Sequence, residues 1–307
     1  MNEKKIITSG DFKEKIKILN KLKAGKNNIV FIGESGTGKT FLTRYYHKIS
    51  SRRNFPLIEI NLSSIPEELM ESTLFGYERG SFTGAIENRK GILENADRGI
   101  VVFENIEDIS IISQAKLLKF LEDMKIIPVG SIKSVKLDLI IISHFKRNPY
   151  HLIREKKLRE DLFFRLNGIT IPLSPFDMWM DIEEKKKFIM ELFKAISEKE
   201  RRNLKLTHGV LNEISRLSFK GNIRELETFL KSLFYYIPKR KKIIREIPES
   251  ILNLKEEIAL KTLQEVEREY IIKILKFTGG NKSKASKILG ISRKGLIEKC
   301  KKFGIKI

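Results

Sequence analysis

The sequence predicts an α/β fold, with a parallel sheet covered by helices on both faces and further helical units after it. Three observations predict this fold. Short apolar runs typical of buried strands alternate with stretches of helical spacing. A glycine-rich loop joins the first apolar run to the first of these helical stretches. From about residue 176 the apolar runs stop, and helical patterns dominate.

The predicted elements can be placed in order along the chain. Asn28–Ile32 is expected to be a buried strand, because this apolar run ends in the glycine loop, and Lys39–Ser50 has helical spacing. Further strands are expected at Pro56–Asn61, Gly99–Glu104 and Leu137–Ser143, and a helix at Ser113–Asp123. The predicted domains are a sheet subdomain (1–172), a helical lid (173–237), a charged linker (238–262) and a compact helical unit (263–307).

The composition is that of a globular protein, with 41% hydrophobic and 32% charged residues. Cys300 is the only cysteine, which excludes disulfides and cysteine-rich metal sites within one chain. No apolar run approaches the ~18 residues that a bilayer span needs, and the N-terminus lacks the pattern of a signal peptide. We therefore expect a cytoplasmic protein with no membrane partner.

The net charge of +21 is partly a general richness in lysine, but it is also unevenly distributed. Residues 271–307 contain eleven basic residues and a single acid, Glu298. A compact basic terminus is typical of proteins that bind the phosphate backbone of nucleic acids. Double-stranded DNA is therefore the expected partner of this end of the chain.

The glycine loop reads GESGTGKT and fits the pattern of a phosphate-binding loop between a strand and a helix. Glycines let backbone N–H groups surround phosphate oxygens, and the helix N-terminus adds partial positive charge. The loop predicts ATP and Mg²⁺ as ligands, with Lys39 at the β/γ-phosphates and the Thr40 hydroxyl on the metal. The expected nucleotide-binding residues of the loop are Gly33, Glu34, Ser35, Gly36, Thr37, Gly38, Lys39 and Thr40.

A second motif is more specific. Residues 71–85 read ESTLFGYERGSFTGA, and the last six resemble the GAFTGA loop of sigma-54-dependent transcriptional activators, the bacterial enhancer-binding proteins. In that family the loop touches sigma-54, and the nucleotide state raises or lowers it. Taken alone, the motif would also fit a glycine-bounded turn with a buried phenylalanine. The resemblance implies that the sigma-54 contacts are Gly80, Ser81, Phe82, Thr83, Gly84 and Ala85.

The resemblance extends from about Asn28 to Gly304, and it implies an AAA+ fold: a P-loop three-layer parallel sheet with a small helical lid. It also implies assembly into a homo-oligomer, a hexameric ring that is dimeric when inactive. Asn61 matches the family's switch asparagine, and QAKLLKFL at 114–121 resembles the helix before its sensor strand. Arg159 and Arg165, in LREDLFFRL, fall at its arginine fingers; pairing with Glu160 or Asp161 is the alternative for these two side chains. Arg224, in GNIRELE, matches the lid sensor.

The sequence departs from the family at three places near the expected nucleotide. Glu104-Asn105 stands where the family has Asp-Glu, Ser143-His144 stands for Thr-Asn, and Lys220 replaces a proline. Glu104 keeps a carboxylate for Mg²⁺. Asn105 cannot accept a proton and so cannot act as a general base, a role that raises the reaction rate roughly 10²–10⁴-fold. Glu107 and Asp108 are the nearby carboxylates that remain. His144 is expected to donate one hydrogen bond at the nucleotide. These changes predict a weakened ATPase or a nucleotide-gated assembly role.

Residues 267–305 resemble the Fis-type helix-turn-helix at the end of such activators. The helix at Glu267–Phe277 carries an apolar face, Lys282–Leu289 forms the first helix of the motif, and Gly290 makes the turn. Ser292 is the expected N-cap of the recognition helix Ser292–Phe303. Arg293 and Lys294 are expected at base edges. Phosphate contacts are expected from Lys282, Lys284, Lys287 and Lys299.

Two functions follow for the same chain. The first is an ATP-hydrolysing regulator that assembles into a ring and remodels the sigma-54 RNA polymerase holoenzyme from a DNA-bound position. The second binds ATP but barely hydrolyses it, and acts in mixed rings with a catalytically complete partner. A third possibility, an unrelated P-loop ATPase with a DNA-binding tail, does not account for the GSFTGA motif. Few residues precede Asn28, so no receiver domain is expected, and control is expected from expression level or partner proteins.

Overall fold

The computed structural model describes residues 10–179, 181–238, 240–253 and 267–305, without residues 269, 273, 276, 277 and 279 of the last segment. The chain divides into two compact units, Met1–Pro248 and Glu249–Ile307. Within the described residues, no helix is both long enough and apolar enough to cross a membrane.

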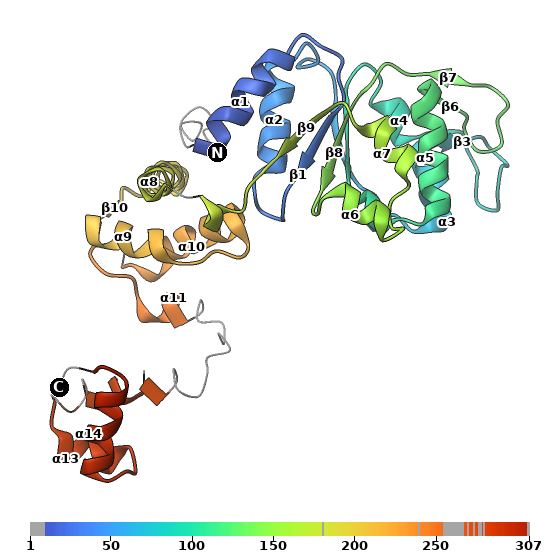
Figure 1. Ribbon diagram of the computed structural model, residues 1–307. Helices are drawn as coiled ribbons and strands as arrows, with labels where there is room; N and C mark the ends of the chain where they lie inside the picture. The colour runs from blue at the N-terminus through green and yellow to red at the C-terminus, as the bar shows by residue number, and fades with distance from the viewer. Residues whose placement is uncertain are drawn as a thin grey trace. The chain divides into compact units, whose positions relative to one another are not determined.

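A five-stranded parallel sheet lies at the centre of the first unit (Figure 1). Its strands are arranged in the order β2-β5-β8-β1-β9. The first strand, β1, precedes the glycine loop and lies between the last two strands of the sheet, β8 and β9. The five strands are β1 (Ile29–Ile32), β2 (Leu57–Asn61), β5 (Ile100–Glu104), β8 (Ile140–Phe145) and β9 (Ile169–Pro172). The predicted α/β class with a parallel sheet is confirmed.

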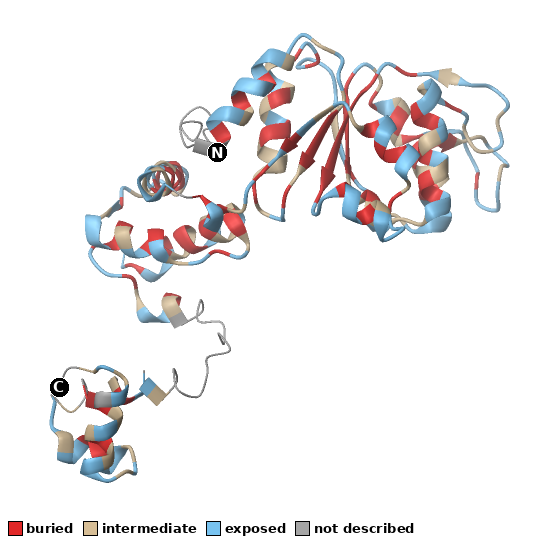
Figure 2. Cartoon of the chain, viewed as in Figure 1, coloured by how far each residue is buried: buried red, intermediate tan, exposed pale blue. Residues whose placement is uncertain are grey.

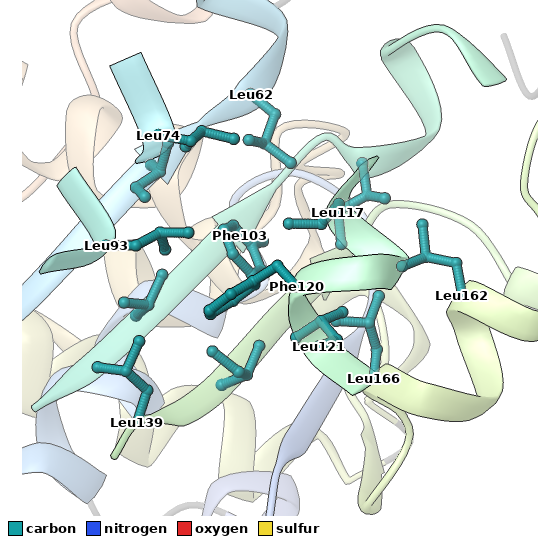
Figure 3. Packing of buried hydrophobic residues seen from close by; sticks show 14 of the residues in the cluster. Leu62, Leu74, Leu93, Phe103, Leu117, Phe120, Leu121, Leu139, Leu162 and Leu166 are labelled. Atoms are coloured by element: carbon teal, nitrogen blue, oxygen red, sulfur yellow. The ribbon is translucent and has the colours of Figure 1, made fainter. Parts of the chain in front are cut away.

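Helices cover both faces of the sheet, as the sequence predicts. On one face α1 (Gly10–Leu22) packs against α2 (Lys39–Ile49). The other face carries α3 (Glu67–Phe75), α4 (Ile92–Asn95), α5 (Ile111–Asp123), α6 (Pro149–Arg154) and α7 (Glu160–Leu166). Figure 3 shows Phe103 of β5 packed between Leu74, Leu93 and Phe120 from three of these helices. The β5 and β8 side chains are buried on both faces, which is why these segments read as continuous apolar runs (Figure 2).

Two short antiparallel pairs lie beyond the sheet on the side of α3 and α5. They are β3 (Gly76–Tyr77) with β4 (Arg89–Lys90), and β6 (Lys125–Ile126) with β7 (Val135–Lys136). The GSFTGA motif lies in the connection between β3 and β4. A bridge between Tyr77 and Val129 joins the two pairs.

The lid contains three helices: α8 (Ile182–Lys199), α9 (His208–Arg216) and α10 (Asn222–Tyr236). Asp181 caps α8 by accepting from the N–H groups of Glu183 and Glu184, and Thr207 caps α9. Phe176, Phe188 and Phe219 are fully buried and form the aromatic centre of the lid. Helical patterns therefore predicted this part of the chain well.

The segment expected to be a linker differs from the prediction in its first part. β11 (Ile243–Ile244) pairs in parallel with β10 (Lys205–Leu206) of the lid, and Ile244 and Ile247 are buried. A short helix, α11 (Glu249–Asn253), follows. The division between the units falls after Pro248; Ile244 and Ile247 before it are buried, whereas Ile243 is 46% exposed. Residues 254–262 of the expected linker lie outside the described residues.

The second unit has its own small apolar core. Residues 267, 268, 270–272, 274 and 275 are helical, followed by α13 (Lys282–Ile288) and α14 (Arg293–Lys302). Ile271, Ala285, Leu296 and Cys300 are buried together. Asn281 caps α13 through its side chain, and the Ser292 hydroxyl accepts from the Gly295 N–H at 3.0 Å, as its place before α14 predicts.

The sequence placed one strand of the sheet wrongly and missed another. The expected strand Leu137–Ser143 begins only at Ile140 and runs to Phe145. The Leu137 N–H donates to Met124 O and the Asp138 N–H to the Asp97 carboxylate, so this backbone is held by neighbouring loops rather than by the sheet. The edge strand β9 was not predicted. It has only four residues, and two of them are Thr170 and Pro172, so it lacks the apolar run by which the other strands were recognised.

Candidate nucleotide-binding site

Three polar side chains stand in one row at the carboxyl edge of the sheet. In the register of the parallel strands, Asn61 of β2 faces Glu104 of β5, and Glu104 faces His144 of β8. His144 in turn faces Phe31 of β1, two residues before the glycine loop. The open carboxyl edge of a parallel sheet, where the loops diverge, is where α/β proteins place their ligand sites. The sheet order therefore brings residues from four strands to one place.

The glycine loop turns between β1 and α2 with a backbone that only glycine adopts easily. Gly36 and Gly38 have φ angles of +81° and +101°. The Lys39 ammonium donates to the carbonyl oxygens of Gly33 at 2.5 Å and Glu34 at 2.9 Å. Thr37 is buried and its hydroxyl donates to Glu34 O, so it shapes the loop rather than facing the site.

A cavity of about 330 Å³ lies over this loop. It has the size of small-ligand pockets, and its polar lining fits a phosphorylated ligand. It is lined by Ser35, Gly36, Gly38, Lys39, Thr40, Phe41, Glu104, Asn105, His144, Lys146, Ile223, Arg224 and Glu227. The structure thus brings most of the expected nucleotide residues together, whereas Gly33, Glu34 and Thr37 are not part of the lining.

The lid closes the cavity through the start of α10. The Arg224 guanidinium donates to the Ser35 hydroxyl at 3.0 Å, and the Ile223 N–H donates to Gly36 O at 3.0 Å. Asn222 is buried and its amide donates to Ser35 O and to the Glu34 carboxylate. A Cβ atom on Gly36 would lie 2.1 Å from Gly221 O, so glycine is needed there for contact with the lid as well as for the turn.

Glu104 is held by a buried hydrogen-bond chain. His144 Nδ1 lies 2.9 Å from Glu104 Oε1, and His144 Nε2 lies 2.8 Å from the hydroxyl of Thr43 on α2. The carboxylate can only accept, so Nδ1 carries the proton, and the Thr43 hydroxyl donates to Nε2. Burial lowers the pKa of the 3% exposed His144, which favours the neutral ring. The hydrogen bond from His144 lowers the pKa of Glu104, so its carboxylate is ionised at neutral pH.

The side chain of Asn105 is directed to Asn61. Its amide nitrogen donates to Asn61 Oδ1 at 2.7 Å and contacts the Ser63 hydroxyl at 3.3 Å. Ser63 also donates to Asn61 Oδ1. The backbone of Asn105 is left-handed, with φ +58°, a conformation that asparagine tolerates better than glutamate does.

The Lys39 ammonium is partly withdrawn from water. Burial lowers its pKa from 10.5 to about 8, against the opposing attraction of Glu104. An ammonium that has lost part of its hydration gains more from a nearby phosphate than an exposed lysine does, because the local dielectric is lower. Lys39 is therefore placed to hold an anion, and Thr40 and Glu104 supply the oxygen donors that Mg²⁺ prefers. These residues fit a magnesium–triphosphate ligand.

The two remaining carboxylates do not line the cavity. Burial raises the pKa of Glu107, whose Oε2 is buried and has no hydrogen-bond partner among the described residues. Asp108 lies 3.6 Å from Lys146, which does line the cavity. Neither carboxylate therefore replaces the one that Asn105 lacks.

The two expected arginine fingers lie away from the cavity of their own chain. Arg159 pairs with Asp161 at 2.7 Å on an open surface beside the exposed ring of Phe164. The Arg165 guanidinium donates to the carbonyl oxygens of Leu121 and Glu122, where it caps the C-terminus of α5. Arg159 is thus exposed toward solvent, and Arg165 has a structural role within its own subunit.

The GSFTGA loop is exposed and folded on itself. The Gly80 N–H donates to Ala85 O at 2.8 Å, and Gly80 and Gly84 have positive φ angles with open space around them. Phe82 is 43% exposed and packs edge-on against Tyr77, with ring centroids 4.9 Å apart. Ser81 meets Gly130 of the neighbouring β6–β7 connection, Thr83 is exposed, and Ala85 is buried. The alternative of a buried phenylalanine does not hold.

The expected DNA-binding residues lie on α13 and α14 or just before α14. Lys284, Lys287, Arg293 and Lys294 are exposed, whereas Lys282 is partly buried. Ser292 is exposed and serves as the cap of α14. Lys299 is paired with Glu267 at 2.5 Å, so its charge is already compensated within the unit.

Several residues of the site were not singled out from the sequence, among them Thr43, Asn222 and Lys146. Thr43 and Asn222 hold His144 and the loop from behind, and Lys146 adds a cation to the cavity. Asn222 follows the glycine of the lid motif, which is a signal that could have identified it. Thr43 has no such signal, because a threonine within a helix gives no indication of its buried partner.

Two families match the chain. Residues 6–172 match the family described as "Sigma-54 interaction domain", and residues 262–303 match "Bacterial regulatory protein, Fis family". Regulatory protein AtoC of Escherichia coli K12 is 32% identical over 93% of this chain and 64% of its own length. The putative uric acid sigma-54-dependent transcriptional regulator UacR of the same strain is 33% identical over 94% of this chain and 51% of its own. The chain therefore spans between half and two thirds of these relatives.

A solved structure shows the same fold. NtrX from Brucella abortus in complex with ATP superposes with a TM-score of 0.68 at 27% identity, covering 97% of this chain and 68% of that one. That protein, of the same fold, was crystallised in complex with ATP.

Proposed function

Since the chain belongs to the family of sigma-54 interaction domain proteins that carry a Fis-type helix-turn-helix, we propose that it is a DNA-bound transcription regulator that acts on sigma-54 RNA polymerase. It binds Mg²⁺–ATP in the cavity over the glycine loop, assembles into a ring, and presents the Gly80–Ala85 loop to sigma-54. The observation that carries the proposal is the joint lining of this cavity by the glycine loop, Glu104 and Arg224 of the lid. A ligand there touches both subdomains, so its phosphates alter the position of one relative to the other.

Each residue of the cavity has a distinct part in this proposal. Lys39 and the loop N–H groups bind phosphate oxygens, Thr40 and Glu104 hold the metal, and Arg224 binds from the lid. His144 orients Glu104 rather than binding the nucleotide, because both ring nitrogens are already engaged with protein groups. Bound Mg²⁺ supplies charge neutralisation for the phosphates.

The contact between Asn105 and Asn61 links the cavity to the loop. Asn61 ends β2, and η1 (Leu62–Ser64) and α3 follow it directly toward the GSFTGA loop. A change at Asn105 therefore shifts the hydrogen bonds of Asn61 and Ser63 at the start of this path. Arg159 is partly exposed and reaches a neighbouring subunit once its pairing with Asp161 is broken.

A second candidate function is favoured by one specific observation. The side chain at position 105 is an amide that donates to Asn61, so this position offers no carboxylate to activate water. In this version the chain binds ATP but barely hydrolyses it, and it enters mixed rings in which another subunit supplies the base. Phosphoryl transfer depends mainly on positioning and charge stabilisation, so slow hydrolysis without a base remains compatible with the first version.

The test is steady-state ATP turnover by the pure protein, with and without sigma-54 holoenzyme, against a Lys39→Ala control. Turnover well above the control supports the hydrolysing regulator. Turnover equal to the control, together with nucleotide binding that Lys39→Ala abolishes, supports the second candidate. A protein that binds neither nucleotide nor holoenzyme would contradict both.

A further inference from the structure

A group of basic side chains lies on the lid, in the connection between α8 and α9 and in the segment that follows α10. We call it the basic edge. None of its members belongs to the nucleotide cavity or to the helix-turn-helix, and all are exposed. The basic edge consists of Arg201, Lys205, Arg240, Lys241, Lys242 and Arg245.

Parallel pairing of two short strands brings the basic edge together. Lys205 of β10 faces Ile243 of β11, and the Lys205 N–H donates to Lys242 O at 2.9 Å. Lys205 and Ile243 are exposed side by side, whereas Ile244 turns inward and is 1% exposed. Residues almost forty positions apart in the sequence therefore form one surface.

The backbone beneath the basic edge is held in place. The Arg202 guanidinium donates to the carbonyl oxygens of Phe234, Ile237 and Pro238, where α10 ends. The Lys241 N–H donates to Pro238 O and closes a turn. A surface fixed in this way loses little conformational entropy in its backbone when it binds a partner.

The charges of the basic edge have no partner in the described part of the chain. No carboxylate of those residues forms an ion pair with any of the six side chains. Elsewhere in the lid lysines do pair, Lys186 with Glu183 and Lys231 with Glu227. Unpaired cations crowded on one surface repel each other, and a polyanion relieves that repulsion.

Two tyrosines flank the basic edge at the last turn of α10. Tyr235 is 75% exposed and Tyr236 is 50% exposed, so most of each ring lies in solvent. Phenol hydroxyls donate hydrogen bonds to phosphate oxygens, and exposed rings pack against sugars. Cations gathered on one surface, with phenol hydroxyls beside them, fit the phosphate backbone of a nucleic acid.

We propose that the basic edge binds the phosphate backbone of double-stranded DNA adjoining the site held by the helix-turn-helix. This inference rests on the proposed DNA-binding function of the C-terminal unit. Both surfaces belong to one chain, so DNA held by the helix-turn-helix is presented to the basic edge at high effective concentration. The basic edge recognises no sequence. It increases affinity for DNA of any sequence and makes binding more sensitive to salt.

The test measures binding of the full-length chain to a random-sequence duplex by fluorescence anisotropy over a series of salt concentrations. The triple variant Arg240→Gln, Lys241→Gln, Lys242→Gln removes three positive charges from the basic edge. The matched control Lys13→Gln, Lys17→Gln, Lys21→Gln removes three charges from exposed positions on α1. All six side chains are exposed, so both variants are expected to fold, which urea unfolding verifies.

If the three side chains contact phosphates, the slope of log affinity against log salt becomes less steep by about 0.9 for each lost contact, whereas the control keeps the wild-type slope. Equal slopes for the edge variant and the control would overturn the proposal. The same holds if the edge variant loses binding to anionic vesicles, or its oligomeric state, while its binding to DNA is unchanged.

A second arm separates this inference from the function on which it rests. The variant Arg293→Gln, Lys294→Gln tests the helix-turn-helix in the same assay. If that variant binds DNA like the wild type while the edge variant does not, the role proposed for the C-terminal unit fails and the basic edge remains. If the opposite is found, the basic edge is excluded and the helix-turn-helix remains.

Discussion

The amide nitrogen of Asn105 donates to the side-chain oxygen of Asn61 at 2.7 Å, across the ends of two neighbouring strands. Asn105 follows Glu104, the residue that faces His144. Asn61 ends β2, and η1 and α3 follow it in the chain before the GSFTGA loop. The hydrogen bond is between two neutral groups, so its strength does not change with pH. Position 105 therefore bonds to Asn61 whatever the pH, but it offers no carboxylate to activate water.

Replacing Asn105 with glutamate is expected to raise ATP turnover by about 10²-fold or more, because a positioned base contributes roughly 10²–10⁴-fold. The change also places glutamate in a left-handed backbone conformation, which costs about 1–3 kcal/mol of stability. Phosphate release in the steady state measures the first effect and urea unfolding the second. Asn105→Gln is the control, since it adds the methylene without the carboxylate. Equal turnover in the two variants would show that position 105 is not the base position.

Nucleotide affinity is expected to fall as the pH rises through about 8, the pKa to which burial lowers the Lys39 ammonium. Only the protonated amine attracts phosphate, and a bound triphosphate raises its pKa again, so binding takes up a proton above that pH. Calorimetry with a non-hydrolysable analogue in buffers of different ionisation enthalpy measures the uptake. The Lys39→Arg variant keeps its charge throughout this range and should lack the decline. An unchanged decline in Lys39→Arg would assign it to another group.

The Thr43→Val variant is expected to lose about 1–3 kcal/mol of stability, because it leaves His144 Nε2 buried without a donor. Valine has nearly the shape of threonine, so little packing is lost. Thr228→Val in α10 is the matched control: its hydroxyl is exposed and donates to Arg224 O of its own helix, and a change within about 0.5 kcal/mol is expected. Chemical unfolding of both variants decides the matter. A loss no greater than that of the control would mean that His144 is satisfied in another way.

The Gly36→Ala variant is expected to prevent the lid from closing on the glycine loop, since the added Cβ would lie 2.1 Å from Gly221 O. Its positive φ adds strain. We expect nucleotide binding to be lost and the first unit to be destabilised. Gly209→Ala in α9 is the control, because nothing lies within 4 Å of its Cβ position, and it should be neutral or stabilising by up to about 1 kcal/mol. Wild-type nucleotide affinity in Gly36→Ala would contradict the closed arrangement.

The Phe82→Ala variant is expected to remain folded yet lose its response to sigma-54 holoenzyme. The ring is 43% exposed and makes an edge contact with Tyr77, which is worth roughly 0.5–1.5 kcal/mol. Phe55→Ala, at a ring of similar exposure before β2, is the control for losing an exposed aromatic side chain. Co-sedimentation with holoenzyme in the presence of a transition-state analogue compares the two. Equal binding by both variants would remove the loop from the interface.

Much of the fold could be predicted because its strongest signals are local. Val101 and Ile141 lie in central strands buried on both faces, so their neighbours are apolar too and the strands read as continuous runs. The glycine loop and the N-cap Ser292 are determined within a few residues by backbone geometry. The short edge strand β9 lacked such a pattern, because its place depends on β1 beside it and hardly on its own residues.

The sequence by itself determined the types of residue at the site and their order along the chain: a phosphate loop, a carboxylate without its usual neighbour, and a histidine at the end of a strand. Only the tertiary structure decided what each of them contacts. It turned both nitrogens of His144 toward Glu104 and Thr43, directed Arg165 to the end of α5, and folded residues 240–247 against the lid. Backbone conformation depends on near neighbours and is therefore readable from the sequence. The partner of a polar side chain depends on which distant segments pack beside it.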